Sequence, residues 1–231
     1  MHNFRKKFIL TADDFGLNAL ANQNILALAQ AKKIDRVSIM MDGVFTSTEL
    51  EELKSSGVFL DIHLATTPGK KGRRRAKESA LLRGMFFLLR LFSPSMRSDA
   101  IALSWEKQIE QFYTLVGKYP DGINSHQHIH YFPPYFRIAI QLAQKKKIPF
   151  LRFGKETLIA SNANVYRILF WLHKKNRNIF LFSGLRSTDH LVSLDWVKKL
   201  PVFLSQKPCG SIEIVCHPEL QQDFERIQKY F

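Results

Sequence analysis

The chain has 231 residues, of which 45% are hydrophobic and 12% aromatic, so it carries enough apolar material for a large core. Lys and Arg outnumber Asp and Glu by 34 to 20, and the formal net charge of +14 favours an anionic partner such as a phosphorylated substrate, nucleic acid or an acidic membrane surface. No uninterrupted apolar run reaches the roughly 18 residues of a membrane-spanning helix, so no such helix is expected.

Cysteine usage and the N-terminus bear on the cellular compartment. Cys209 and Cys216 form neither a CxxC pair nor a secreted disulfide pattern. The apolar run Phe8–Leu10 is too short for a signal peptide. We therefore expect a cytoplasmic protein with a single domain over residues 1–231, and leave open a peripheral position at the inner face of the membrane and a homodimer.

Strand-sized and helix-sized patterns alternate along the chain. In chain order they are a strand over Phe8–Thr11, a helix over Asn18–Lys32, strands over Val37–Met41 and Val58–Leu64, a helix over Ser104–Leu115, a strand over Gly122–Ser125, a helix over Tyr135–Lys146, and strands over Phe150–Phe153 and Ser211–Cys216. This alternation predicts an α/β fold whose parallel strands are joined by crossover helices, either as a barrel or as an open doubly wound sheet.

Polar side chains follow the predicted strands where each strand ends. In both architectures ligands bind at the carboxyl ends of the strands, so these side chains are expected at one rim. They are Asp13 and Asp14, His63, His126, Arg152 and His217. For Asp13 and Asp14, a turn with a helix cap is a local alternative.

The stretch NSHQHIH, residues 124–130, places three of the eight histidines at alternate positions. If it stays extended, all three imidazoles share one face, about 6.5 Å apart, so one metal ligand is favoured over three. His126 would be that ligand, and His128 and His130 would line the pocket or support the metal ligands from behind.

An Asp/His/His set leaves coordination positions open for water and substrate, as catalytic metal sites require. His63, His126 and one of the two aspartates supply such a set. Hydrolysis of an acyl group also needs a base and an acid for the leaving group, for which Asp13 and His217 are suitable.

The strings TADDFGLN, DIHLATT, NSHQHIHYFPP, LRFGKE and IEIVCHPE together resemble the YdjC-type carbohydrate deacetylase family, which includes chitooligosaccharide deacetylase-like proteins, over about residues 6–220. The resemblance implies a distorted (β/α) barrel of the glycoside hydrolase/deacetylase type. It also implies one divalent metal ion, Mg²⁺ or Zn²⁺, and hydrolysis of the acetamide of an N-acetylated sugar.

The same resemblance implies roles for individual residues. Asp14, His63 and His126 match metal ligands, Asp13 the general base, and His217 the acid that protonates the amine. Arg152 matches an arginine of the substrate pocket. Three positions depart from the family pattern, since Asn124 replaces an aspartate, Asp61 a glycine and Glu219 the glycine of an HPG ending.

Residues 69–97 contain nine Lys/Arg and the single acid Glu78, and they interrupt the alternating pattern like an insertion. We predict either a solvated basic flap or a segment that lies on an anionic membrane, which would suit a lipid-linked or phosphorylated sugar. Val165–Phe182 resembles it in composition.

Three other functions are alternatives to an active deacetylase. One is a catalytically altered descendant that binds carbohydrate or a membrane surface, and another is a metal-dependent phosphoesterase with the same ligands. A nucleic-acid-binding module is the third, but the chain has no helix-turn-helix, zinc-finger or RNP-like string, so no nucleic-acid partner is expected.

Overall fold

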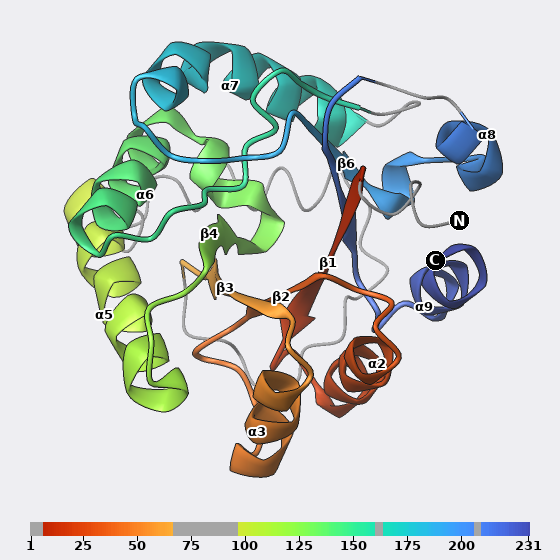
Figure 1. Ribbon diagram of the computed structural model, residues 1–231. Coiled ribbons are helices and arrows are strands. Elements are labelled where there is room, and N and C mark those ends of the chain that lie inside the picture. Colours follow the sequence, from red (N-terminus) through yellow and green to blue (C-terminus); the bar gives the residue numbers. More distant parts are fainter. Residues whose placement is uncertain (1–6, 67–96, 160–163, 206–208) are drawn as a thin grey trace.

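The computed structural model describes residues 7–66, 97–159, 164–205 and 209–231 (Figure 1). Its strands are β1 (Phe8–Phe15), β2 (Arg36–Ile39), β3 (Phe59–Leu64), β4 (Gly122–Ser125), β5 (Thr157–Leu158), β6 (His190–Ser193) and β7 (Ile212–Cys216). Its α-helices are α2 (Ala19–Gln30), α3 (Ser47–Ser55), α5 (Ser98–Val116), α6 (Pro133–Lys145), α7 (Asn164–Leu181), α8 (Leu200–Ser205) and α9 (Gln221–Tyr230). Two 3-10 helices, η2 (His126–Tyr131) and η3 (Leu194–Trp196), follow β4 and β6.

The strands form one parallel seven-stranded sheet in the order β4-β3-β2-β1-β7-β6-β5. Figure 1 shows the sheet curled in the middle of the molecule with helices around its outer side. Single bridges continue the ring beyond β4, from Ile123 to Leu151 and from Phe150 to Arg186. The predicted distorted (β/α) barrel is confirmed.

The strand predicted over Phe150–Phe153 is wrong in detail. Only Phe150 and Leu151 form bridges, one on each side of the segment. Pro149 has no N–H to donate, and Gly154 has a φ of +69°, so regular pairing is limited to a short stretch.

The other predictions agree with the structure to within a few residues, apart from longer extents for β1 and α5. Five predicted strands correspond to β1, β2, β3, β4 and β7, and the three predicted helices to α2, α5 and α6. The prediction omitted β5, β6, α3, α7, α8 and α9. The basic segment over residues 69–97 lies outside the described residues except for Arg97, at the start of α5.

The two faces of the sheet differ in chemistry, because successive side chains in a strand point to opposite sides. One face supplies buried apolar side chains beneath the helices, among them Leu10, Val37, Ile62 and Ile214. The other face lines the barrel interior with buried polar side chains, namely Thr11, Asp13, Arg36, Ser38, Asp61, His63, Asn124 and Glu213. The interior is therefore a polar network and the apolar core lies between sheet and helices.

None of the described helices combines the length and the apolar character that crossing a membrane would require.

Candidate active site

Asp14 lies in a distorted end of β1. The pairing of β1 with β2 shifts register between Ala12 and Phe15, and Asp14 has a φ of +70°, a left-handed conformation that non-glycine residues rarely adopt. Such backbone strain is typical of functional sites. As a result Asp13 and Asp14 reach different partners.

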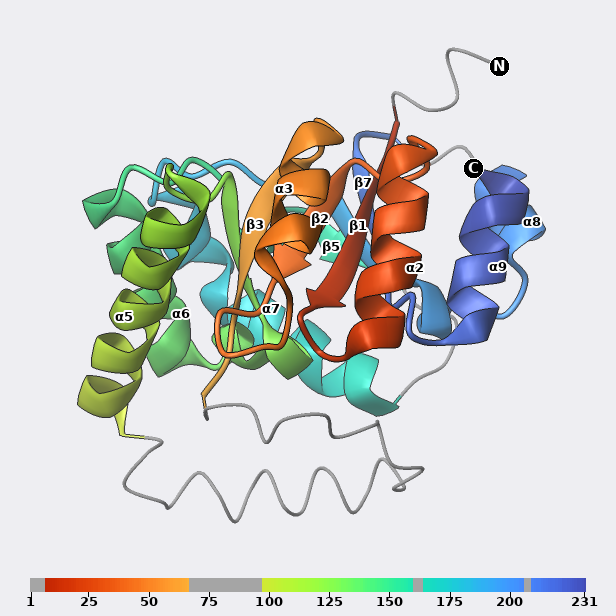
Figure 2. The ribbon, with the colours of Figure 1, turned by 90° about the horizontal axis from the view of Figure 1, so that it is seen from below.

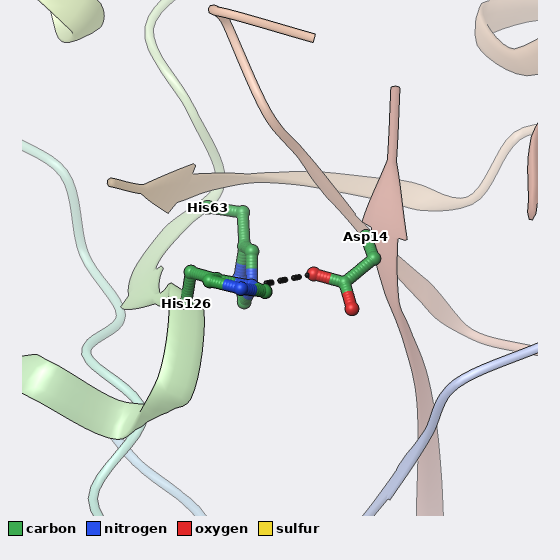
Figure 3. A group of neighbouring side chains, drawn as sticks. All are labelled: Asp14, His63 and His126. Atoms are coloured by element: carbon green, nitrogen blue, oxygen red, sulfur yellow. Dashed lines mark hydrogen bonds and ion pairs between the residues drawn. The ribbon is translucent and has the colours of Figure 1, made fainter. Parts of the chain in front are cut away.

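Three side chains from distant parts of the sequence meet at this strand end (Figure 3). Oδ1 of Asp14 lies 3.1 Å from Nε2 of His63 and 2.9 Å from Nδ1 of His126. One donor atom from each of the three side chains lies within 4.8 Å of the other two. The group is buried except for His126, which is partly exposed.

These three side chains fit a divalent cation. Donor atoms bound to one such ion lie about 3.0–3.4 Å apart when each is about 2.1 Å from it, close to the Asp14 distances here. Oδ2 of Asp14 is buried and has no hydrogen-bond partner among the described residues. A buried carboxylate oxygen without a partner is costly, and an ion beside it would remove that cost.

The histidine-rich stretch does not stay extended. β4 ends at Ser125, and Gln127 and His128 have φ values of 56° and 54°, which turn the chain within η2. Of its three histidines only His126 belongs to the cluster around Asp14. His128 packs against Trp196 with ring centroids 5.8 Å apart, on the other side of the turn.

His130 is completely buried behind the site. One ring nitrogen, Nδ1, lies 2.6 Å from Oγ of Ser125, and the other, Nε2, lies 3.0 Å from the carbonyl oxygen of Arg152. Both ring nitrogens thus have partners within the protein, and the imidazole of His130 connects η2 to the backbone at Arg152 by a hydrogen bond.

A chain of hydrogen bonds fixes the tautomer of His63. Ser38 Oγ donates to the Asp13 carboxylate at 2.7 Å, so it accepts from Nδ2 of Asn124 at 2.8 Å. The amide oxygen of Asn124 then faces Nδ1 of His63 at 2.5 Å, and that nitrogen must carry the proton. In its neutral form, which a metal ligand requires, His63 therefore has its lone pair on Nε2, which points at Asp14.

Arg152 is fully buried between two carboxylates. Its Nη1 and Nη2 donate to the two oxygens of Asp13 at 2.7 and 2.8 Å, and its Nε donates to Glu213 at 2.8 Å. Thr11 also donates to Glu213, at 2.9 Å. The guanidinium thus fixes the orientation of the Asp13 carboxylate through a bidentate pair of hydrogen bonds.

Comparison with known proteins identifies a family. A family model described as YdjC-like protein matches residues 7–230, almost the whole chain. The chain belongs to the YdjC-like family.

Two relatives of this YdjC-like protein have names that specify an activity. It is 25% identical to a carbohydrate deacetylase of Mus musculus, over 82% of this chain and 66% of the mouse protein. It is also 25% identical to a chitooligosaccharide deacetylase of Salmonella paratyphi B, over 96% of this chain and 85% of that protein. The chain spans two thirds or less of the length of the vertebrate relatives that it matches.

A solved structure resembles the fold. A candidate cellobiose-phosphate cleavage protein from Enterococcus faecalis V583 superimposes with a TM-score of 0.60 at 19% sequence identity, over 94% of this chain and 84% of the other. At this identity the likeness shows the shared fold alone.

The protonation of the aspartates in this YdjC-like protein is set by their neighbours. Burial raises the pKa of the Asp13 carboxyl, but the charges of Arg152 and His63 outweigh it and hold this pKa well below its usual range. Burial acts in the same way on Asp14, where His126 and His63 lower the pKa. Both groups are therefore carboxylates at neutral pH.

His217 follows β7 and is buried close to Asp13, whose pKa its charge also lowers. Its backbone N–H donates to Oδ2 of Asp223 at 2.9 Å. Pro218, the next residue, is also held in place, because the side chain of Asn24 in α2 donates to its carbonyl at 2.7 Å. The segment after β7 is thus anchored to α2 and α9.

The helix-cap alternative for the two aspartates is not what the structure shows. Asn18 caps α2 by accepting from the backbone N–H of Ala21. Asp13 and Asp14 belong to β1 and to the site.

Asn124 and Asp61, which depart from the family pattern, both bond side chains inside the barrel. Asn124 bonds both His63 and Ser38, and Asp61 forms a buried ion pair with Arg36. The sequence interpretation missed Arg36, Ser38 and Glu213. Their signal was present, since each is a polar residue at alternate spacing within an apolar strand.

Proposed function

We propose that this protein is a metal-dependent deacetylase of N-acetylated sugars. The observation that carries the proposal is the meeting of His63 and His126 at Oδ1 of Asp14, whose other oxygen, Oδ2, is buried and has no hydrogen-bond partner among the described residues. The named activities of the mouse and Salmonella relatives add support.

Asp14, His63 and His126 would hold one divalent cation, Mg²⁺ or Zn²⁺. Such an ion, when bound, polarises a carbonyl and lowers the pKa of water from 15.7 to about 7. Two imidazoles and a carboxylate are compatible with zinc, and the carboxylate also suits a harder cation.

Asp13 would be the general base. It is ionised, it neighbours Asp14 in the chain, and Arg152 and Ser38 fix the direction of its oxygens. It accepts a proton as water adds to the acetyl carbon. Arg152 then acts through Asp13, because its three donor nitrogens already bond carboxylates.

His217 would be the general acid. It donates a proton to the sugar nitrogen as the bond between that nitrogen and the acetyl carbon breaks, so that acetate and a free amine leave. His128, at the turn of η2, is the histidine of the stretch that we assign to substrate contact, whereas His130 supports the turn.

The test measures acetate release from N-acetylglucosamine oligomers with added Mg²⁺ or Zn²⁺. We expect Asp13→Asn to suppress turnover with near-normal metal content, and His126→Ala to lose the metal. The control is Asp121→Asn, which neutralises a carboxylate that pairs with Lys118 outside the site.

Unchanged turnover in Asp13→Asn would refute the assignment of the base. Wild-type metal content in His126→Ala would refute the metal site. Phosphate release from sugar phosphates without acetate release would favour a phosphoesterase instead.

A further inference from the structure

α7 has an outer face that combines large apolar and basic side chains. Ile168, Trp171, Leu181 and Phe182 are four of the eleven large hydrophobic side chains most exposed in the described part of the chain. Phe182 is 91% exposed and Trp171 55%. The other seven are spread over α2, α5, α8, β3 and a loop.

The exposed residues lie on one side of the helix. At about 100° per residue, Ile168, Trp171, Lys174, Lys175, Leu181 and Phe182 fall within an arc of about 140° that has Trp171 near its middle. We call these six residues the outer face of α7, and include Phe182, which directly follows the helix and whose N–H still bonds the carbonyl of Asn178. Leu169, Leu172 and Phe180 lie on the opposite side and are buried.

The charge of this face has one sign. Residues 164–182 contain four Lys/Arg and no acid. Nζ of Lys175 lies 4.1 Å from the ring centroid of Trp171, and Nζ of Lys174 lies 4.7 Å from that of Phe170. Basic residues beside exposed Trp, Ile, Leu and Phe are typical of helices that lie in the interface of a membrane.

The basic charge selects among partners for this face. A second copy would bring a second set of cations against the first, so self-association through α7 is disfavoured. Nucleic acid would leave the aliphatic side chains of Ile168 and Leu181 without a stacking partner. An anionic lipid bilayer meets both requirements, because it supplies acidic headgroups and an apolar layer beneath them.

We propose that the outer face of α7 docks on an anionic lipid bilayer. α7 is fixed to the barrel at the carboxyl ends of its strands, where His173 bonds the carbonyl of Gly154 at 2.7 Å and Asn176 bonds that of Tyr131 at 2.6 Å. Figure 2 shows α7 at the end of the molecule toward which β1 points. Docking would therefore bring the rim that carries Asp14 near the bilayer.

This inference does not depend on the deacetylase activity, and it rests on α7 rather than on residues 69–97. The test is cosedimentation of the full chain with vesicles of phosphatidylcholine, with and without phosphatidylserine. We expect binding only to the anionic vesicles. Lys174→Gln/Lys175→Gln should lower the partition coefficient about 30-fold, from about 1 kcal/mol per basic residue.

Matched controls separate α7 from general charge and hydrophobicity. Lys198→Gln/Lys199→Gln removes the same charge just before α8 and should bind like the wild type. Trp171→Ser/Phe182→Ser should lower binding on the order of tenfold or more. Leu103→Ser, which removes a side chain 58% exposed on α5, should not.

Tryptophan fluorescence gives a second measurement, which reports on the bound wild-type protein and does not depend on a variant that binds less. Trp105 and Trp196 are buried, so Trp171 is the exposed one of the three tryptophans. Anionic vesicles should shift its emission to the blue, brominated lipids should quench it, and Trp171→Phe should remove both effects. Equal binding by the α7 variants and their controls, or no binding of the wild type to anionic vesicles, would overturn the proposal.

Discussion

Asn124 accepts a hydrogen bond from His63, whose Nδ1 lies 2.5 Å from the amide oxygen, while the same amide donates to Ser38 at 2.8 Å. This pair links the orientation of a metal-ligand candidate to the carboxylate of Asp13. An aspartate at position 124 could accept from His63 but could not donate to Ser38 while ionised. The asparagine therefore has a specific role in this chain.

We expect Asn124→Ala to weaken the binding of Zn²⁺ or Mg²⁺ about 10- to 100-fold, because His63 loses the partner that fixes its tautomer. Isothermal titration calorimetry of the metal-free protein measures this directly. Asn176→Ala, which removes a buried amide that bonds Tyr131, is the control and should keep wild-type affinity. Equal affinities of the two variants would contradict the role of Asn124.

Arg152→Lys should shift the acid limb of the pH profile of kcat/KM to higher pH. Burial raises the pKa of Asp13 and Arg152 is the strongest opposing charge, so a lysine that makes fewer bonds to the carboxylate leaves this pKa higher. Below the new pKa Asp13 binds a proton and is lost as a base. A profile that falls in height but keeps its acid limb would show that Arg152 acts only in packing.

The buried pair of Arg36 and Asp61 gives a prediction for stability. Nε of Arg36 donates to Asp61 at 2.8 Å, and the guanidinium lies 4.2 Å from the ring centroid of Phe150. Asp61→Ala leaves Arg36 buried and unpaired, which should lower the free energy of unfolding by about 3–5 kcal/mol.

Urea unfolding measures this loss. The double substitution Arg36→Met/Asp61→Leu should recover most of the stability, since both charges leave together. Glu106→Ala, which breaks the pair with Lys145 at the surface, should lower the stability far less than Asp61→Ala. A double variant no more stable than Asp61→Ala would count against the pairing.

His130 should make the protein less stable in acid. Burial lowers its pKa to about 3 in the folded state, against about 6.5 in the unfolded chain. Between these values only the unfolded state binds the proton. Stability from His130 is therefore complete above about pH 6.5 and falls with pH by up to about 1.4 kcal/mol per unit.

Unfolding of the wild type and of His130→Gln between pH 7 and pH 4 isolates this contribution. The variant should start lower, because it loses two buried hydrogen bonds, but should depend less steeply on pH. Ring ¹⁵N shifts of His130 in the folded protein should stay those of the neutral form at pH 5. A folded-state midpoint near 6.5 would refute the prediction.

Strands with strong apolar patterns could be predicted from the sequence, and β4 was predicted with the bounds that the structure has, Gly122–Ser125. β5 has two residues, too short for a pattern to stand out, whereas β6, with four residues like β4, was overlooked. α3 has a readable signal that the interpretation omitted, the capping box of Thr46 and Glu49. α7 was not predicted either, although its buried residues Leu169, Leu172 and Phe180 recur at helical spacing.

The set of side chains at the rim could be predicted because parallel strands deliver their carboxyl ends to one edge. The hydrogen-bond partners that hold these side chains from inside the barrel could not be predicted in the same way. Arg152 was expected to face the substrate, yet it lies in the interior against Asp13 and Glu213. Which carboxylates an arginine reaches depends on the stagger of the barrel strands, which spacing within single strands does not specify.

The left-handed residues Gln127 and His128 have a consequence for anyone who transplants this motif. Because the chain reverses between them, the histidines at 126, 128 and 130 enter three separate environments: one beside Asp14, one against Trp196 and one under Arg152. Grafting the letters HQHIH onto a straight strand of another scaffold would present a row of equivalent imidazoles. A working transplant would have to include the turn.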